Sequence, residues 1–271
     1  MVLLHVCGRG ALHSATPRSE YTIGSMQLDP PEASQKFRKS DWFPGGPLTS
    51  KQDGPSYRGE STMHIALYGA TGKAGSRILT ELLSRGHQVT AIARDPSKLS
   101  PQKGLAIVQG DVSSAEAIAE KIKGTEAVVD AYGPPADDTD QLVIVTQNFI
   151  EAVERTDVPR LIVVGGAGSL IIPPGVTLIA SGHVPAEWMP IAVSHAEALK
   201  LLERSDINWT YFSPAAFFVP GERTGKFRLG KNELIANEQG ESRISLEDYA
   251  IALVDELEEP KNEFARFTIG Y

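Results

Sequence analysis

The stretch His64-Ile-Ala-Leu-Tyr68 runs directly into the glycine-rich stretch Gly69-Ala-Thr-Gly72-Lys-Ala-Gly75. The first five residues are mostly apolar and are bounded by turn formers, which predicts a short buried strand. After the glycines, apolar residues recur at helical spacing from Ile78 to Leu83, and Gly86 ends the pattern. The stretch therefore predicts a strand, a tight glycine turn and an amphipathic helix.

The same rhythm continues as far as residue 165. Apolar runs predict strands, and helical periods predict helices, over 88–93 (strand), 105–109 (strand), 113–123 (helix, opened by a capping box at Ser113), 127–131 (strand), 142–153 (helix) and 161–164 (strand). Strands that are largely apolar and alternate with amphipathic helices are typical of a parallel sheet covered on both faces. The predicted fold class is α/β.

The rhythm changes beyond residue 165. Residues 166–190 contain four prolines and are too long for an idle connection, so we expect a loop that faces a substrate. A helix over 191–205 and a strand over 208–212 follow, and then a turn-rich stretch over 214–240. Ser245 is expected to cap a last helix, before a final strand over 267–269.

Composition excludes several classes of protein. The 271 residues carry 26 Lys plus Arg against 34 Asp plus Glu, a formal charge of −8, which does not favour nucleic acid or an anionic membrane as a partner. Apolar runs are far shorter than the roughly 20 residues needed to span a bilayer. A single cysteine and scattered histidines predict neither a disulfide framework nor a metal site. We expect a cytoplasmic protein.

The first 62 residues differ from the rest of the chain. They contain 8 Ser, 7 Gly and 6 Pro and no sustained apolar period, which predicts a disordered extension. Such an extension could be an organelle transit peptide, or a leader from an upstream start with Met63 as the natural first residue. Either alternative assigns residues 63–271 to a single domain, with the only cysteine outside it.

The glycine turn predicts a phosphate site. Glycines at the carboxyl end of a parallel strand let a pyrophosphate approach the backbone at a helix N-terminus. The spacing Gly-x-x-Gly-x-x-Gly departs from the common Gly-x-Gly-x-x-Gly fingerprint, so a tight turn without a nucleotide is the alternative. Its position after the first strand of the domain favours a dinucleotide. The residues predicted to bind it are Gly69, Thr71, Gly72, Lys73, Ala74 and Gly75.

The end of the second predicted strand indicates which dinucleotide binds. Arg94 stands where a basic residue binds a 2′-phosphate, which favours NADP. The adjacent Asp95 would instead favour NAD if its carboxylate held the ribose. Asp111, after the third strand, could accept from an adenine amino group or could cap a helix. Tyr132 and Gly133, after the fourth strand, are expected to line the nicotinamide ribose.

Several stretches together resemble a known family. The sequence over 65–75, Ala-Arg-Asp-Pro at 93–96, Gly-Asp at 110–111 and Arg-Ile-Ser-Leu-Glu-Asp-Tyr-Ala at 243–250 are similar to the NAD(P)H-binding, NADH-flavin reductase group of atypical short-chain dehydrogenases. Biliverdin reductase/flavin reductase is its better-understood relative. The resemblance implies a Rossmann-like doubly wound parallel sheet with helices on both faces and a small C-terminal substrate-binding portion. It also implies hydride transfer from a reduced nicotinamide to a flavin or similar planar acceptor.

Classical members of the wider superfamily use a Tyr-x-x-x-Lys pair to move a proton. Here Lys200 is present, but Ala196 stands four residues before it, which argues against an ordinary alcohol dehydrogenase or epimerase. The resemblance implies that Ser169 lies beside the nicotinamide, and it makes His195 the candidate proton donor. The predicted catalytic residues are therefore Ser169, His195 and Lys200.

Two functions remain open from the sequence. One is an NADPH-dependent oxidoreductase that acts, as a monomer or homodimer, on a flavin or similar planar molecule. The other is a non-catalytic redox sensor that binds NAD(P), which the missing tyrosine also suits. Trp188, Phe217 and Phe218 could form a slot for a planar ring, although at least one phenylalanine is expected to fill the core.

Overall fold

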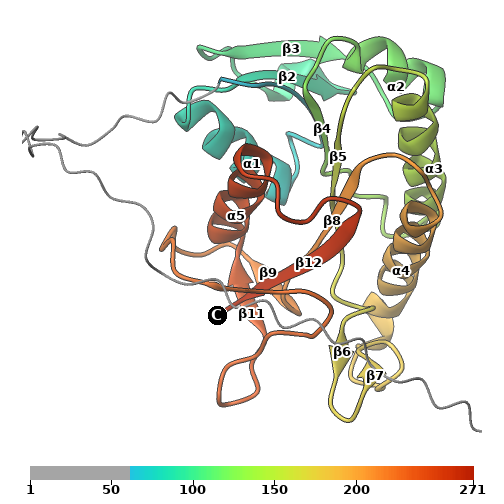
Figure 1. Ribbon diagram of the computed structural model, residues 1–271, viewed down its shortest axis with the longest axis vertical. Coiled ribbons are helices and arrows are strands. Elements are labelled where there is room, and N and C mark those ends of the chain that lie inside the picture. The colour runs from blue at the N-terminus through green and yellow to red at the C-terminus, as the bar shows by residue number, and fades with distance from the viewer. Residues whose placement is uncertain (1–61) are drawn as a thin grey trace, which may run out of the picture. The chain divides into compact units, whose positions relative to one another are not determined.

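The computed structural model describes residues 62–271, which form a twisted sheet with helices packed on both of its faces (Figure 1). The extension predicted over residues 1–62 lies outside the described residues, apart from Thr62. Its disorder and its origin therefore stay predictions.

The sheet has eight strands in the order β10-β12-β8-β5-β4-β1-β2-β3. Their bounds are β1 His64–Tyr68, β2 Gln88–Ala93, β3 Leu105–Gln109, β4 Ala127–Asp130, β5 Leu161–Val164, β8 Trp209–Ser213, β10 Arg228–Gly230 and β12 Ala265–Gly270. Neighbouring strands are parallel except β10, which pairs antiparallel with β12 at the edge. The order reverses between β1 and β4, since the chain runs outward to β3 before it returns beside β1. In open sheets of this kind, the ligand crevice lies at the carboxyl ends of the strands at the reversal.

The helices cover the sheet in two layers (Figure 1). On one face, α1 (Lys73–Ser84) packs beside α5 (Leu246–Glu258). On the other face lie α2 (Ala115–Ile122), α3 (Gln141–Glu154) and α4 (Met189–Glu203). Alternate residues of each strand point to opposite faces, and both faces are buried. The predicted Rossmann-like doubly wound α/β fold is confirmed.

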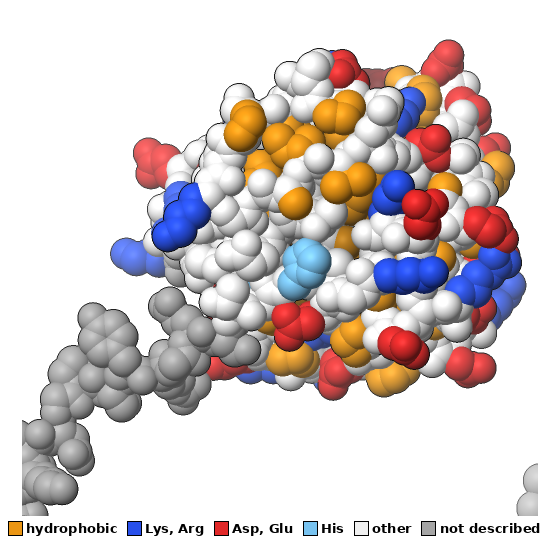
Figure 2. All heavy atoms as spheres, turned by 90° about the horizontal axis from the view of Figure 1, so that it is seen from above, with side chains coloured by type: hydrophobic (Ala, Val, Ile, Leu, Met, Phe, Trp, Pro, Cys, Tyr) orange, Lys and Arg blue, Asp and Glu red, His pale blue; other side chains and the backbone are white. Residues whose placement is uncertain are grey.

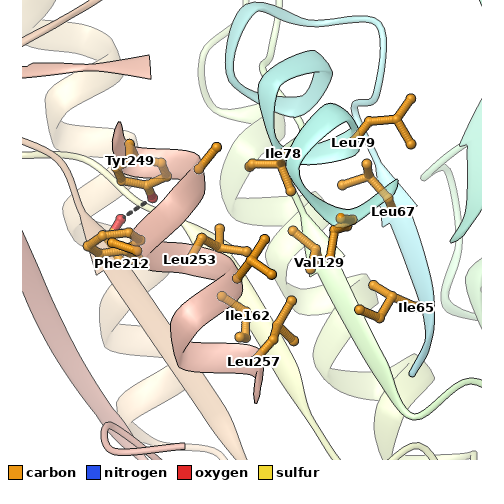
Figure 3. Packing of buried hydrophobic residues seen from close by; sticks show 14 of the residues in the cluster. Ile65, Leu67, Ile78, Leu79, Val129, Ile162, Phe212, Tyr249, Leu253 and Leu257 are labelled. Atoms are coloured by element: carbon orange, nitrogen blue, oxygen red, sulfur yellow. Dashed lines mark hydrogen bonds between the residues drawn. The ribbon is translucent and has the colours of Figure 1, made fainter. Parts of the chain in front are cut away.

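Figure 3 shows the core under α1 and α5, where side chains of the strands interdigitate with those of both helices. Ile65 and Leu67 of β1 are fully buried there. The ring of Phe212 stacks between Tyr249, at a centroid distance of 4.1 Å, and Phe267, at 3.9 Å. The Tyr249 hydroxyl donates to the Phe212 carbonyl oxygen at 2.7 Å. These contacts fix α5 against the centre of the sheet.

Three short features differ from the sequence expectation. The loop predicted over 166–190 contains a small hairpin, β6 (Ile171–Ile172) with β7 (Val176–Thr177), and the 3₁₀ turn η2 (Ala186–Trp188). The stretch over 214–240 contains β10 and also β9 (Phe217–Val219), which pairs with β11 (Arg243–Ser245). The capping box predicted at Ser113 is wrong by one residue, because the Ser114 hydroxyl accepts from Ala117 N and is the N-cap of α2.

One pocket lies at the opposite edge of the sheet from the glycine turn. It has a volume of about 240 Å³ and is lined by His64, Gln88, Val89, Thr90, Gly104, Leu105 and Ala106. Figure 2 shows the face of the molecule that is seen from above Figure 1. On this face, Lys and Arg side chains lie among Asp and Glu side chains. Because ligands of such sheets bind at the carboxyl edge, this pocket is not part of the candidate site.

Candidate functional site

The turns after β1 and β4 meet at the carboxyl edge of the sheet. Gly69 has a φ of +75°, and a Cβ atom there would lie 2.1 Å from the carbonyl oxygen of Ala131. Ala131 N in turn donates to Tyr68 O at 3.2 Å. Glycine alone tolerates both this backbone conformation and this close approach. The predicted glycine turn therefore borders the point where the strand order reverses.

The turn itself is closed by a backbone hydrogen bond. Gly72 N donates to Gly69 O at 2.8 Å, and a Cβ atom on Gly75 would lie 2.1 Å from the same oxygen. Gly75 is buried and Ala74 is partly buried, whereas Thr71, Gly72 and Lys73 are exposed. Gly69 and Gly75 thus shape the turn, and residues 71–73 lie exposed on its outer side.

The start of α1 has no side-chain acceptor for its amides. Gly72 is the N-cap without a side-chain hydrogen bond, and the first turn contains no acidic residue. Ser114 and Ser245 cap α2 and α5, and α3 and α4 also begin without a side-chain cap, but only α1 follows the glycine turn. The first N–H groups of a helix need an acceptor and lie at the positive end of its dipole. This end of α1 therefore fits the pyrophosphate of a dinucleotide.

Arg94 directly follows β2 and is exposed. Within residues 62–271, its guanidinium forms no hydrogen bond and no ion pair. Asp95, by contrast, begins the 3₁₀ turn η1 (Pro96–Lys98), because its Oδ1 accepts from Ser97 Oγ at 2.6 Å and from Ser97 N at 3.2 Å. The hydrogen bond from the Ser97 hydroxyl lowers the pKa of Asp95. The Arg94 guanidinium therefore has N–H groups free to bind a ligand, whereas the Asp95 carboxylate is occupied by Ser97.

Asp111 holds the loop that leads into α2. Its Oδ1 accepts from Ser113 Oγ at 2.5 Å and from Ser113 N at 2.9 Å, and these hydrogen bonds lower its pKa, with a smaller effect from the charge of Arg94. Because Ser114 is the N-cap of α2, the alternative that Asp111 caps this helix is wrong. The predicted contact with adenine stays a prediction.

Tyr132 and Gly133 follow β4 on the other side of the crevice. Tyr132 N donates to Asp130 Oδ1 at 2.9 Å, and the Tyr132 hydroxyl donates to Gln141 Oε1 at 3.1 Å. Gly133 is exposed, and a Cβ atom there would meet nothing within 4 Å. Gly133 therefore borders open space, and the predicted contact of both residues with the nicotinamide ribose stays a prediction.

Two buried polar groups below this wall were not predicted. Asp130 and Tyr68 are partners in the pairing of β4 with β1, and both are almost fully buried. Asp130 Oδ2 and the Tyr68 hydroxyl have no hydrogen-bond partner among the described residues. Burial raises the pKa of the Asp130 carboxyl to about 7. Asp130 stands at the end of an apolar strand, and nothing in the sequence indicated that its side chain is buried.

A second cavity lies between α4 and the β6–β7 hairpin and has a volume of about 450 Å³. Its polar lining comes from Ser169, Thr177, Glu197, Lys200, Glu203 and Arg266, and its apolar lining from Ile179, Val193, Ala196 and Leu199. Below, we refer to this cavity as the Ser169 pocket. It brings together the predicted residues Ser169 and Lys200, and it includes Ala196.

The third predicted catalytic residue, His195, does not line the Ser169 pocket. Its ring lies against Gly166, where an added Cβ atom would come within 2.8 Å of it. The Tyr211 hydroxyl lies 3.3 Å from His195 Nδ1, donates to His195 O at 2.9 Å and accepts from Gly166 N at 3.0 Å. Burial lowers the pKa of His195 to about 4. The imidazole is therefore neutral at pH 7, and a role as proton donor stays a prediction that requires its neutral N–H.

Lys200 lines the Ser169 pocket, whereas the three aromatic residues predicted to form a slot are dispersed. Lys200 is exposed and donates to Glu197 Oε1 at 2.7 Å. Trp188 and Phe217 are 61% and 62% exposed, whereas Phe218 packs against Tyr249 at a centroid distance of 4.6 Å. Phe218 is thus the phenylalanine that belongs to the core, and no ring contact joins the three aromatic residues within the described chain.

Comparison with known proteins agrees with the fold and with a nicotinamide dinucleotide as the cofactor. The family model described as NAD(P)H-binding matches residues 69–260. YwnB, an uncharacterized protein of Bacillus subtilis, is 44% identical over 211 residues, which are 76% of this chain and 98% of YwnB. The chain belongs to the NAD(P)H-binding family, and the predicted nicotinamide dinucleotide cofactor is confirmed at this level.

Two solved structures are similar over nearly their whole length. A candidate epimerase from Bacteroides thetaiotaomicron is 44% identical with a TM-score of 0.73, covering 78% of this chain and 97% of its own. A candidate NADH-flavin reductase from Streptococcus pneumoniae is 35% identical with a TM-score of 0.70, covering 77% of this chain and 99% of its own. These neighbours agree with the family resemblance seen in the sequence.

Residues 62–271 lack two further features. No helix in this part of the chain is long and apolar enough to cross a membrane. Nor does it contain a group of three or more His, Cys, Asp and Glu side chains that could hold a metal ion.

Proposed function

We propose that this protein is an NADPH-dependent reductase that passes a hydride to a flavin or a similar planar acceptor. The observation that carries the proposal is the Ser169 pocket, about 450 Å³ in volume, in a chain of the NAD(P)H-binding family. Its lining combines a hydroxyl, a guanidinium and other polar side chains with four apolar residues, a combination that suits a flat ring with polar edges. The similarity to a candidate flavin reductase supports the same substrate class.

The residues of the crevice have separate tasks in this proposal. The glycine turn and the first turn of α1 hold a pyrophosphate, and Tyr132 and Gly133 line the ribose next to the nicotinamide. NADPH, when bound, supplies the hydride, and one further proton from solvent balances the reduction of the acceptor. Ser169 offers its hydroxyl to the acceptor and orients it.

The preference for NADP over NAD rests on Arg94 and its neighbour. Arg94 has no partner within the described chain, whereas the Asp95 carboxylate already accepts two hydrogen bonds from Ser97. A free guanidinium can pair with a 2′-phosphate through two parallel hydrogen bonds. An aspartate that holds its own loop is less suited to a ribose diol.

The preference for a planar acceptor over an alcohol or sugar rests on Ala196. Carbonyl reduction and epimerisation need a residue that moves a proton at the substrate oxygen. Ala196 has no such group, and Lys200 donates to Glu197. A flavin can take its proton from solvent, so the chain has only to position the rings.

A redox sensor without turnover is the second candidate function. It is favoured by Ala196, which has no group that moves a proton, and by Lys200, which donates to Glu197 Oε1. Such a protein would bind NADPH and NADP⁺, and its interactions with other molecules would depend on the redox state of the bound nucleotide. The absence of a tyrosine at position 196 is compatible with this function.

Steady-state NADPH oxidation separates the two candidates. The full chain is assayed with FMN, FAD, riboflavin and a quinone, and its affinity for NADPH is measured by fluorescence titration. The reductase proposal expects saturable turnover well above the reaction without protein. Tight NADPH binding with turnover equal to that background would instead support the sensor. For either function, we propose that residues 63–271 form the active domain and that the protein acts in the cytoplasm. We further propose that it binds a small planar ligand and consists of one or two subunits.

A further inference from the structure

The Ser169 pocket contains a partly buried arginine from the last strand. Arg266 lies on β12 opposite Tyr211 of β8, and its guanidinium lines the pocket. Burial lowers its pKa from the usual value, although arginine stays protonated in proteins. Within residues 62–271, it forms no ion pair with a carboxylate. Moving a cation partly out of water without a counter-ion costs free energy. The neutral groups that Arg266 contacts therefore indicate the role of its charge.

The partners of Arg266 are oxygen atoms of two loops. Nη1 donates to Ser169 Oγ at 2.8 Å and to Ser169 O at 3.1 Å. On the other side of the fork, Nε and Nη2 both donate to Asn232 Oδ1, at 3.1 and 2.9 Å. Asn232 O accepts from Ile171 N at 2.8 Å, which ties the same loop to the β6–β7 hairpin. The guanidinium thus fixes both the backbone and the side chain of Ser169.

These contacts determine the direction in which the Ser169 hydroxyl donates. A serine hydroxyl has one hydrogen to donate and two lone pairs that accept. Since arginine has no acceptor, the hydrogen bond from Nη1 occupies a lone pair and leaves the hydroxyl hydrogen free. No other described residue forms a hydrogen bond with Ser169 Oγ. The free hydrogen is therefore available to a ligand in the pocket.

The charge of Arg266 also makes this hydroxyl a better donor. A donor that accepts from a cation is polarised, and hydrogen bonds in such chains strengthen one another. Glu203 of α4 and Glu233 of the loop before β11 are the carboxylates whose charge acts on Arg266. Neither lies within the 4 Å that defines an ion pair with it, so the nearest oxygens remain those of Ser169 and Asn232.

We propose that Arg266 is a positioning residue that turns Ser169 into a hydrogen-bond donor for the atom of the acceptor on which negative charge develops during reduction. This inference rests on the proposed function and specifies its substrate class: a planar molecule with a carbonyl oxygen or ring nitrogen at its edge. Hydride addition places negative charge on such an atom, and a preorganised donor stabilises it. Ile179, Val193 and Leu199 form the apolar wall for the ring.

A double-mutant cycle between Ser169 and Arg266 tests the proposal. The variants are Ser169→Ala, Arg266→Met, Arg266→Lys and the double variant Ser169→Ala/Arg266→Met. Arg228→Met is the matched control, because Arg228 lies on the neighbouring strand β10 and donates to Ala236 O and Tyr271 O but not to Ser169. Each is assayed for riboflavin reduction by NADPH, for NADPH affinity and for thermal unfolding.

We expect Ser169→Ala and Arg266→Met each to lower kcat with riboflavin about 10- to 100-fold, the scale for a lost donor at a developing charge. NADPH affinity should stay within about twofold of wild type, since neither residue belongs to the glycine turn or to the end of β2. In the double variant, Arg266→Met should cost at most about twofold beyond Ser169→Ala, because its effect passes through that hydroxyl. Arg266→Lys should recover part of kcat, and Arg228→Met should keep it.

Riboflavin binding provides a readout that does not depend on turnover. The dissociation constant of oxidised riboflavin is measured by flavin fluorescence on the NADP⁺-saturated protein. Each single variant should bind riboflavin about 2- to 10-fold more weakly, the range for the loss of one neutral hydrogen bond. The double variant should bind no more weakly than Ser169→Ala alone. If wild type binds riboflavin with this coupling but does not reduce it, the proposed function fails, and Arg266 keeps only its role of directing the Ser169 hydroxyl to the ligand.

Three results would overturn the inference. One is an Arg266→Met variant with wild-type kcat and wild-type riboflavin affinity. Another is an additive cycle, in which the double variant loses the product of the two single losses. The third is the absence of riboflavin binding by wild type. If Arg266→Met does not fold, Arg266→Lys and the double variant Ser169→Ala/Arg266→Lys replace the two Met variants in the cycle.

Discussion

Gly69 lies so close to Ala131 that a Cβ atom on the glycine would stand 2.1 Å from the alanine carbonyl oxygen. The turn after β1 and the turn after β4 therefore touch through backbone atoms alone. This contact defines the edge of the crevice that we assign to NADPH. A side chain at position 69 would separate the two turns and displace the first amides of α1.

Gly69→Ala should abolish NADPH binding and destabilise the fold. The variant combines the strain of a positive φ, about 1–2 kcal/mol, with a backbone clash. Gly124→Ala is the matched control, because Gly124 also has a positive φ, of +77°, but meets nothing within 4 Å. NADPH titration and urea unfolding measure both effects. Equal losses of stability and of binding in the two variants would contradict the role of the contact.

Arg94→Ala should weaken NADPH binding about 10- to 100-fold and leave NADH binding nearly unchanged, because only NADPH carries the 2′-phosphate. Lys98→Ala is the control, since Lys98 is exposed and lies 3.9 Å from Asp95 in an ion pair. The two dissociation constants are compared by fluorescence. A similar loss for both nucleotides would remove Arg94 from the phosphate.

Asp130 should make stability depend on pH in a window that few carboxyl groups share. Burial raises its pKa from 3.8 to about 7, so the folded state keeps a proton that the unfolded chain loses near pH 4. Its contribution to stability is full below about pH 4 and is lost as the pH rises to about 7. Asn at this position keeps an acceptor for Tyr132 N and cannot ionise.

We therefore compare wild type with Asp130→Asn. The free energy of unfolding of wild type relative to this variant should fall by about 2–3 kcal/mol between pH 5 and pH 8. Asp137→Asn, at an exposed position in the loop after β4, should show no such trend. Urea unfolding at several pH values provides the measurement. A difference that stays constant with pH would show that Asp130 ionises normally.

The buried pair of Arg160 and Glu256 should contribute strongly to stability. Arg160 Nη2 lies 2.5 Å from Glu256 Oε1, and the two side chains are 7% and 4% exposed. Arg160→Met leaves the carboxylate buried without its cation and should cost about 3–5 kcal/mol. Arg155→Met breaks an exposed pair with Glu116 and should change stability little. Comparable effects in thermal unfolding would argue against burial as the cause.

The elements of the fold that follow from local patterns were predicted closely. The strand over 64–68 and those over 88–93, 105–109 and 161–164 have the predicted bounds, because apolar runs between turn formers leave little choice. The small strands β6, β7, β9 and β10 were not predicted. They are two or three residues long and partly exposed, so only pairing with distant segments defines them.

The candidate site divides in the same way. The glycine turn and Arg94 could be named from the sequence, since each lies at the end of a predicted strand. Asp130 and Arg266 could not, because their roles depend on residues far away in the chain. Nothing around Arg266 in the sequence indicates that it donates to Ser169. Such contacts follow from the packing of β12 beside β8, which a linear pattern does not encode.

Single-turnover reduction of riboflavin tests the central claim most directly. The protein is saturated with NADPH without oxygen and mixed with riboflavin, and absorbance at 340 nm reports the loss of NADPH. The account predicts a decay far faster than the reaction without protein, slowed by deuterium at the transferred position of NADPH and slowed further by Ser169→Ala. A decay at the rate of the reaction without protein would contradict the claim that this protein is a reductase.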